Sequence, residues 1–168
     1  MVHTAPFVPT GEELPIAACA VGLGLLVAWA ATLCWWDLSA RRLPNWLTLP
    51  AGAVAILAVF QYPSWAVGII WPGVYLAQAL LPGPAGRLGG GDIKLAAPLG
   101  VGCAALAGTA GVLAAMVIAG LVTLGAGLLC TAAGSGRKAD HRGVPHGPAM
   151  LFAAAAVAAA RWVATPIM

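Results

Sequence analysis

The sequence predicts an all-α integral membrane protein, a polytopic bundle of about six transmembrane helices. Of the 168 residues, 61% are hydrophobic and only 8% are charged, and the mean hydropathy is +0.94. A soluble globular domain carries roughly 25% charged residues, so this composition excludes that class. The apolar runs are long and lack strict alternation, which favours helices over a transmembrane β-barrel. We expect residues 1–168 to form a single transmembrane domain.

Three predicted spans occupy the first half of the chain. The first extends from about Leu14 to Trp36, the length of one bilayer crossing. The second covers roughly Trp46 to Phe60, and Pro50 is expected to kink its first turns. The third runs from about Trp65 to Leu81. A polar loop joins the first two spans, and an uncharged linker joins the second to the third.

The second half contains one apolar run that must be divided. The run from Ile93 to Cys130 is too long for a single crossing. We place a break near Gly102 to Gly108, which gives a short fourth helix and a longer fifth. A polar loop from Ala133 to Gly147 follows, and the last span runs from about Pro148 to Val163.

Basic residues predict the orientation of these spans. Of the eight Lys and Arg residues, only Arg161 lies near the C-terminal end, and the others follow the first, third or fifth span. Those others are Arg41, Arg42, Arg87, Lys94, Arg137, Lys138 and Arg142. Because basic loops stay in the cytoplasm, we expect a multi-pass protein of the cytoplasmic (inner) membrane with both termini outside.

Acidic residues are rare, and two of them are placed unusually. Glu12 and Glu13 lie near the N-terminus and Asp140 lies in the last polar loop, whereas Asp37 and Asp92 stand at the edges of long apolar runs. A carboxylate at the centre of a bilayer helix costs about 3 kcal/mol, so such groups are usually functional or shielded. The predicted topology places both at the cytoplasmic interface.

Two carboxyl groups at one membrane face can hydrolyse a peptide bond. Neighbouring carboxylates do not readily both ionise, so one activates water while the protonated one polarises the carbonyl. Simpler interpretations exist for each residue taken alone. Asp92 could cap the fourth helix after a turn made by residues 89–91, and Asp37 could be an interfacial acid balanced by Arg41 and Arg42.

Other kinds of site receive no support from the sequence. The four cysteines, Cys19, Cys34, Cys103 and Cys130, form no C-x-x-C pair, so neither zinc nor redox chemistry is predicted. The histidines are too sparse for a metal site, and we expect no cofactor. The net charge of +3 is too small and too dispersed to predict nucleic-acid binding.

Three segments together resemble the type IV prepilin leader peptidases. Asp37–Thr48 reads D-x-x-x-x-R-L-P-N-x-L-T, and Gly89–Leu95 reads G-x-G-D-x-K-L. Pro145–Pro148 matches the P-x-G-P turn that precedes the last span of that family. The resemblance implies an aspartic endopeptidase with Asp37 and Asp92 as its catalytic pair. Its expected supporting residues are Arg42, Pro44, Asn45, Gly89, Gly91, Lys94, Pro145, Gly147 and Pro148.

The resemblance also implies a substrate and a membrane face. Members of the family remove the basic leader from prepilin or pseudopilin precursors at the cytoplasmic side, typically after a glycine. The expected partners are therefore such a precursor and membrane lipid, and the oligomeric state stays open. Lys94 has two interpretations: it could mark the cytoplasmic interface, or it could favour the ionised form of Asp92.

The chain departs from the larger bacterial members of that family. The loop after the first span is roughly ten residues long and the cysteine pairs are missing, so N-methyltransferase activity is not expected. The short form resembles members that serve Flp/Tad-type pili, or archaeal preflagellin peptidases. His146 stands where an apolar residue is expected; it could titrate near neutrality, but we interpret it as an interfacial spectator. A presenilin-like protease, which would carry a P-A-L motif, and a non-catalytic assembly factor are the alternatives.

Overall fold

The computed structural model describes residues 16–82, 89–132 and 145–164, and every secondary-structure element in these ranges is a helix. Three of the described helices, α1, α4 and α5, are long and apolar enough to cross a membrane. The elements in chain order are α1 (Ile16–Ala40), α2 (Asn45–Gln61), the 3₁₀ helix η1 (Pro63–Ile69), α3 (Ile70–Ala79), α4 (Gly90–Ala132) and α5 (Gly147–Ala164). The predicted all-helical class is confirmed for this part of the chain.

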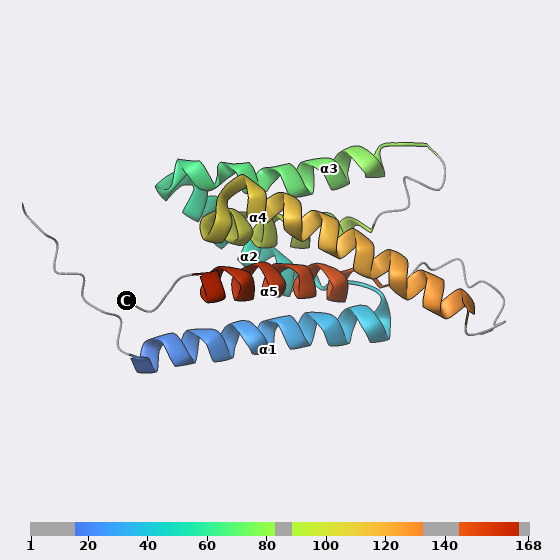
Figure 1. Ribbon diagram of the computed structural model, residues 1–168, viewed down its shortest axis with the longest axis horizontal. Helices are drawn as coiled ribbons and strands as arrows, with labels where there is room; N and C mark the ends of the chain where they lie inside the picture. The colour runs from blue at the N-terminus through green and yellow to red at the C-terminus, as the bar shows by residue number, and fades with distance from the viewer. Residues whose placement is uncertain (1–15, 83–88, 133–144, 165–168) are drawn as a thin grey trace, which may run out of the picture.

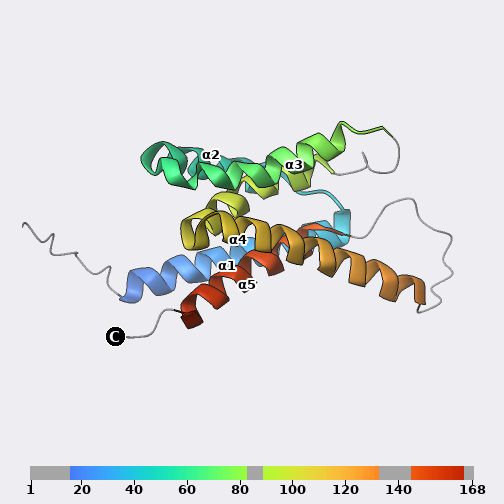
Figure 2. The same ribbon diagram turned by 45° about the horizontal axis from the view of Figure 1, so that its top comes forward.

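The predicted break in the fourth apolar run is also present. Ala107 and Gly108 leave helical geometry inside α4, and Gly108 adopts a φ of 59°, a conformation that glycine tolerates without a steric cost. The chain reverses there and divides α4 into a first limb before Ala107 and a second limb after Gly108. The two limbs lie side by side (Figures 1 and 2). The predicted third span corresponds to η1 and α3 together, and α2 continues through Pro50.

The described helices therefore run alternately in opposite directions. With η1 and α3 taken as one pass and the limbs of α4 as two, the described residues make six antiparallel passes (Figure 1). This arrangement brings the end of α1 and the starts of α2, α4 and α5 to the same end of the bundle. Whether each pass crosses a bilayer stays a prediction.

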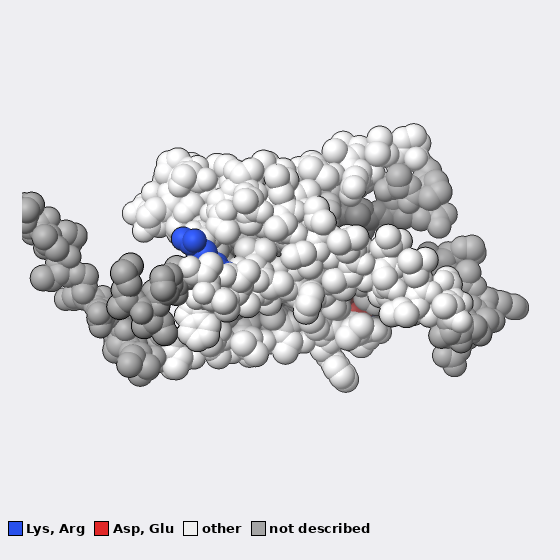
Figure 3. Space-filling view, viewed as in Figure 1, with Lys and Arg blue, Asp and Glu red and all other residues white. Residues whose placement is uncertain are grey.

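The surface of the bundle is apolar. Large hydrophobic side chains are exposed along α1, α2 and α4, including Leu25, Leu57 and Leu124. Figure 3 shows a face on which charged residues occupy only small patches. Exposed apolar surface of this extent would aggregate in water, and it suits contact with lipid. The chain is a membrane protein.

Close backbone packing fixes the first limb of α4 against η1. Gly68 and Gly100 are both buried, and a Cβ atom on either would overlap the backbone of the other helix. Small residues allow helices in a membrane to approach closely and to gain van der Waals contact. This contact supports the limb that begins at Gly90 and carries Asp92.

Several residues used in the topology prediction lie outside the described residues. They are Arg87, Arg137, Lys138 and Arg142. The orientation of the termini consequently stays a prediction.

Candidate active site

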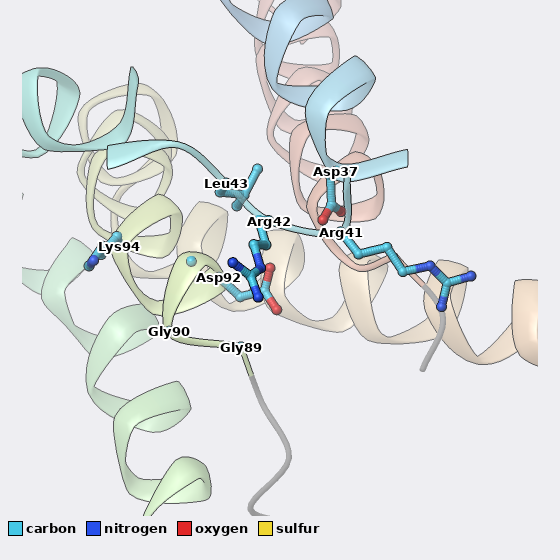
Figure 4. A pocket seen from close by; sticks show the side chains of 9 residues that line it. Asp37, Arg41, Arg42, Leu43, Gly89, Gly90, Asp92 and Lys94 are labelled. Atoms are coloured by element: carbon cyan, nitrogen blue, oxygen red, sulfur yellow. The ribbon is translucent and has the colours of Figure 1, made fainter. Parts of the chain in front are cut away.

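A pocket of about 360 Å³ opens between the end of α1, the loop that leads to α2 and the start of α4. Asp37 and Asp92 both line it, one from the last turn of α1 and the other from the first turn of α4 (Figure 4). Its complete lining is Asp37, Arg41, Arg42, Leu43, Gly89, Gly90, Gly91, Asp92 and Lys94. The first two sequence motifs therefore meet in one cavity.

The end of α1 is shaped by Arg41. Its φ is 51°, and its backbone N–H donates to the carbonyl oxygen of Asp37 at 3.0 Å. This left-handed cap ends the helix and turns the chain toward α2. A non-glycine residue in that conformation costs about 1 kcal/mol or more, so surrounding contacts must hold the turn. The turn therefore lies four residues after Asp37, at the end of the same helix.

Asp37 is held by the start of α5. The side chain is 7% exposed, and its Oδ2 accepts a hydrogen bond of 2.9 Å from the backbone N–H of Gly147. The carboxylate thus faces the N-terminus of a helix, where unpaired N–H groups and the helix dipole favour negative charge. A Cβ at Gly147 would lie 2.9 Å from Asp37 Oδ2, so only glycine fits without displacing the carboxylate.

Asp92 is held within its own turn. Its N–H donates to the carbonyl oxygen of Gly89 at 3.0 Å, and its side chain accepts a hydrogen bond from the Gly89 backbone. This reciprocal pattern resembles a capping box, in which the third helical residue reaches back to the cap. Asp37 lies close enough for its charge to act on Asp92. Asp92 therefore combines a capping contact with a place in the pocket.

Gly91 allows the loop between α1 and α2 to pack on α4. A Cβ at Gly91 would lie 3.0 Å from Leu43 Cβ, whereas a Cβ at Gly90 would meet nothing within 4 Å. A side chain at position 91 would therefore press against Leu43, whereas position 90 has room for one. The contact sets how closely the loop after Asp37 approaches the turn before Asp92.

Polar contacts tie the same loop to α4. Lys94 Nζ donates to Asn45 Oδ1 at 2.8 Å, a contact that neither sequence interpretation of Lys94 included. Pro44 precedes α2, and its carbonyl oxygen accepts from the N–H groups of Leu47 and Thr48. Arg42 extends from the loop into the pocket, and Figure 4 shows Lys94 on the other side of the α4 turn from Asp92.

The predicted P-x-G-P segment contributes its backbone. Gly147 is buried beside Asp37, while Pro145 and Pro148 are half-buried and do not line the pocket. Pro148 has no N–H and sits in the first turn of α5, where a helix needs no donor. We expected this segment to support the site, and its Gly147 N–H is hydrogen-bonded to a pocket residue, Asp37.

Sequence reasoning missed the surroundings of His146. The ring lies between α3 and α4: Tyr75 Oη is 2.6 Å from Nε2, and Thr123 Oγ1 is 2.6 Å from Nδ1. Burial lowers the pKa of His146, and the nearby Asp37 raises it in part. The interpretation as an interfacial spectator did not include these contacts, and whether His146 has a role in the reaction stays a prediction. Polar side chains at Tyr75 and Thr123, inside apolar runs, were the available signal, because such groups require partners.

Comparison with known proteins identifies the family. A model of the type IV leader peptidase family matches residues 24–135, more than half of the chain. The chain belongs to the type IV leader peptidase family. No curated protein and no solved structure matched it.

Family membership implies a membrane peptidase with a prepilin substrate. The range matched by the family model includes Asp37 and Asp92 and ends before Pro145. The link between Gly147 and Asp37 therefore comes from the structure rather than from the family match. Among the described residues, no group of three or more His, Cys, Asp or Glu side chains is arranged to hold a metal ion.

Proposed function

We propose that this chain is an aspartic endopeptidase that removes the basic leader from type IV prepilin or pseudopilin precursors, with Asp37 and Asp92 as its catalytic pair. The observation that carries the proposal is the meeting of both carboxylates in one pocket within a family of leader peptidases. The short loop after α1 favours the form that serves Flp/Tad-type pili, without N-methyltransferase activity.

The proposed reaction needs one negative charge shared by two carboxyl groups. The ionised carboxylate accepts a proton from water, whose oxygen attacks the carbonyl carbon of the scissile bond. The protonated carboxyl donates a hydrogen bond to the carbonyl oxygen as charge develops there. The tetrahedral intermediate then collapses, and the leaving amine takes a proton from the pair. The effect of the Asp37 charge, which raises the pKa of Asp92, suits this division of roles.

The proposed setting is the cytoplasmic face of the inner membrane. The described passes would form six spans of a single domain covering residues 1–168, with both termini outside. Glycines at positions 89 and 91 permit close approach of the chain around Asp92, and Arg42, Pro44, Asn45 and Lys94 shape the loop beside it. Pro145, Gly147 and Pro148 would support Asp37 from the start of α5.

The direct test is leader cleavage of a co-expressed small pilin precursor, followed as a change in precursor size. We expect the intact chain to cleave, and Asp37→Asn and Asp92→Asn each to lose about a thousandfold or more of the rate. Asp140→Asn makes the same chemical change outside the three motifs and should keep full activity. Near-normal turnover by either single mutant would show that the pair is wrongly assigned.

A topology measurement tests the setting independently. In a cysteine-free background, single cysteines at Ser39 and Gly90 stand close to Asp37 and Asp92 in the chain. A membrane-impermeant thiol reagent should label both from the cytoplasmic side and neither from the outside. Labelling from opposite sides would overturn the dyad, whatever the cleavage assay shows.

A further inference from the structure

We propose that His146 is a positioning residue for Asp37, acting through the backbone of Gly147. His146 directly precedes the glycine whose N–H binds Asp37 Oδ2. Its ring is hydrogen-bonded on both sides, to Tyr75 of α3 and to Thr123 of α4. This proposal rests on the proposed peptidase only for its consequence in catalysis; the contact itself is independent of the reaction.

The hydrogen-bond directions determine the tautomer of the ring. Thr123 Oγ1 donates its only proton to the carbonyl oxygen of Ala119 at 2.9 Å, so toward His146 it can only accept. The Nδ1 of His146 must therefore carry a proton and donate. In a neutral ring Nε2 is then an acceptor, and the Tyr75 hydroxyl donates a hydrogen bond to it. Every polar atom of the ring has a partner in this arrangement.

The ring joins three elements at the start of α5. His146 lies one residue before α5, and its partners lie on α3 and on the second limb of α4. Tyr75 is itself buried, with Trp71 packed edge-on against it at 6.2 Å between ring centroids. The ring is therefore attached to a packed part of the bundle, and this attachment fixes the backbone at Gly147.

A neutral ring is also the form compatible with these contacts. Protonation would place a proton on Nε2 and force the Tyr75 hydroxyl to find another acceptor inside the bundle. The titratable groups facing the ring are Asp37 from α1 and Tyr75 from α3, while Thr123 from α4 does not titrate. Asp37 consequently experiences both the hydrogen bond from Gly147 and any charge on His146.

The first test uses NMR of the intact chain in detergent and does not depend on cleavage. The Gly147 amide proton should resonate downfield and exchange slowly in the wild type, and Asp37→Ala supplies the reference for a lost bond. His146→Phe removes both ring hydrogen bonds and should make Gly147 exchange about tenfold faster. His146→Gln, which can still bond to Tyr75, should restore part of the protection.

Two further variants change the partners and leave His146 in place. Tyr75→Phe and Thr123→Val should each shift the Gly147 amide in the same direction as His146→Phe, and by less. Thr32→Val is the matched control, because the Thr32 hydroxyl donates to a carbonyl oxygen of its own helix, at Ala28. An unchanged Gly147 amide signal in His146→Phe would overturn the proposal. If His146→Phe does not fold, an unchanged Gly147 signal in both Tyr75→Phe and Thr123→Val would overturn it instead.

The second test is kinetic and separates positioning from general stability. In folded protein His146→Phe should lower kcat about 10- to 100-fold with little change in KM, and His146→Gln should recover part of kcat. A loss of thermal stability with kcat unchanged would overturn the positioning role. If the wild type cleaves no precursor while the Gly147 amide behaves as expected, the proposed function fails and the positioning of Asp37 stands.

Discussion

Asp37 and Asp92 line the same pocket, but different parts of the chain hold their carboxylates. Asp92 is bonded to Gly89, three residues earlier, in a turn that would form in any helix starting there. Asp37 is bonded to Gly147, which lies 110 residues later in the sequence. One acid is positioned locally, and the other depends on how α5 docks against α1.

The packing of α1 strengthens this contrast. Only 6% of the most apolar stretch of α1 is buried inside the protein, against 28% of the corresponding stretch of α5. Little of α1 is therefore held by protein contacts. Trp29 Nε1 donates to the Leu47 carbonyl oxygen at 3.1 Å, which ties α1 to the first turn of α2. With so few attachments, the bond from Gly147 has a large share in placing Asp37. The comparison teaches that the two acids should respond differently to changes near their glycines.

Adding one methyl group beside each acid should break the comparison most clearly. Gly147→Ala would put a Cβ 2.9 Å from Asp37 Oδ2, and Gly89→Ala would put one 3.3 Å from Asp92 Oδ2. We expect leader cleavage to fall about 100-fold for Gly147→Ala, because its clash displaces a carboxylate held from another helix. Gly89→Ala should cost about tenfold or less, since Asp92 can move with its own turn. Equal losses would contradict the contrast.

A second pair of changes tests the loop that links the two acids. Gly91→Ala would press a Cβ against Leu43 at 3.0 Å and push the loop after Asp37 away from α4, while Gly90→Ala meets nothing. We expect cleavage to fall about tenfold for Gly91→Ala and to stay within about twofold for Gly90→Ala. Both substitutions add a methyl group that favours the helix, and only Gly91→Ala adds a close contact. A similar loss of cleavage in the two variants would therefore contradict the steric explanation.

The smallest effect concerns pH and the environment of Asp37. Burial lowers the pKa of His146 from its usual 6.5, more than Asp37 raises it. The unfolded chain therefore binds a proton at His146 more readily than the folded chain, and this residue costs stability as pH falls below about 6.5. Between pH values of about 7.5 and 5.5, the wild type should lose about 2 °C more of its thermal midpoint in detergent than His146→Phe. The same loss in both proteins would count against a buried neutral ring.

Much of the architecture could be predicted from residue order alone. The apolar segments, the helical class and the break before Gly108 follow from hydropathy and from the position of glycine, because lipid leaves a backbone no alternative to the helix. The two acids were predicted as a pair from their places at apolar edges and from the motifs around them. Their residue types and spacing are local properties of the chain.

Other features were not predictable, for reasons that these same residues show. Lys94 was expected to act at the interface or on Asp92, but it donates to Asn45 because folding brings the start of α2 beside α4. His146 was expected to be a spectator, and its partners come from α3 and α4. Hydropathy identifies which segments are helices, but it does not identify which faces of those helices meet.

The sequence by itself determined the membrane class, the apolar passes, the family motifs and the local turn that holds Asp92. These depend on the chemistry of neighbouring residues and on the absence of water in lipid. Only the tertiary structure decided that Asp37 shares a pocket with Asp92, that Gly147 holds Asp37 and that the His146 ring is bonded to Tyr75 and Thr123. Each of those contacts joins residues far apart in the chain, and it exists only once helix packing has brought them together.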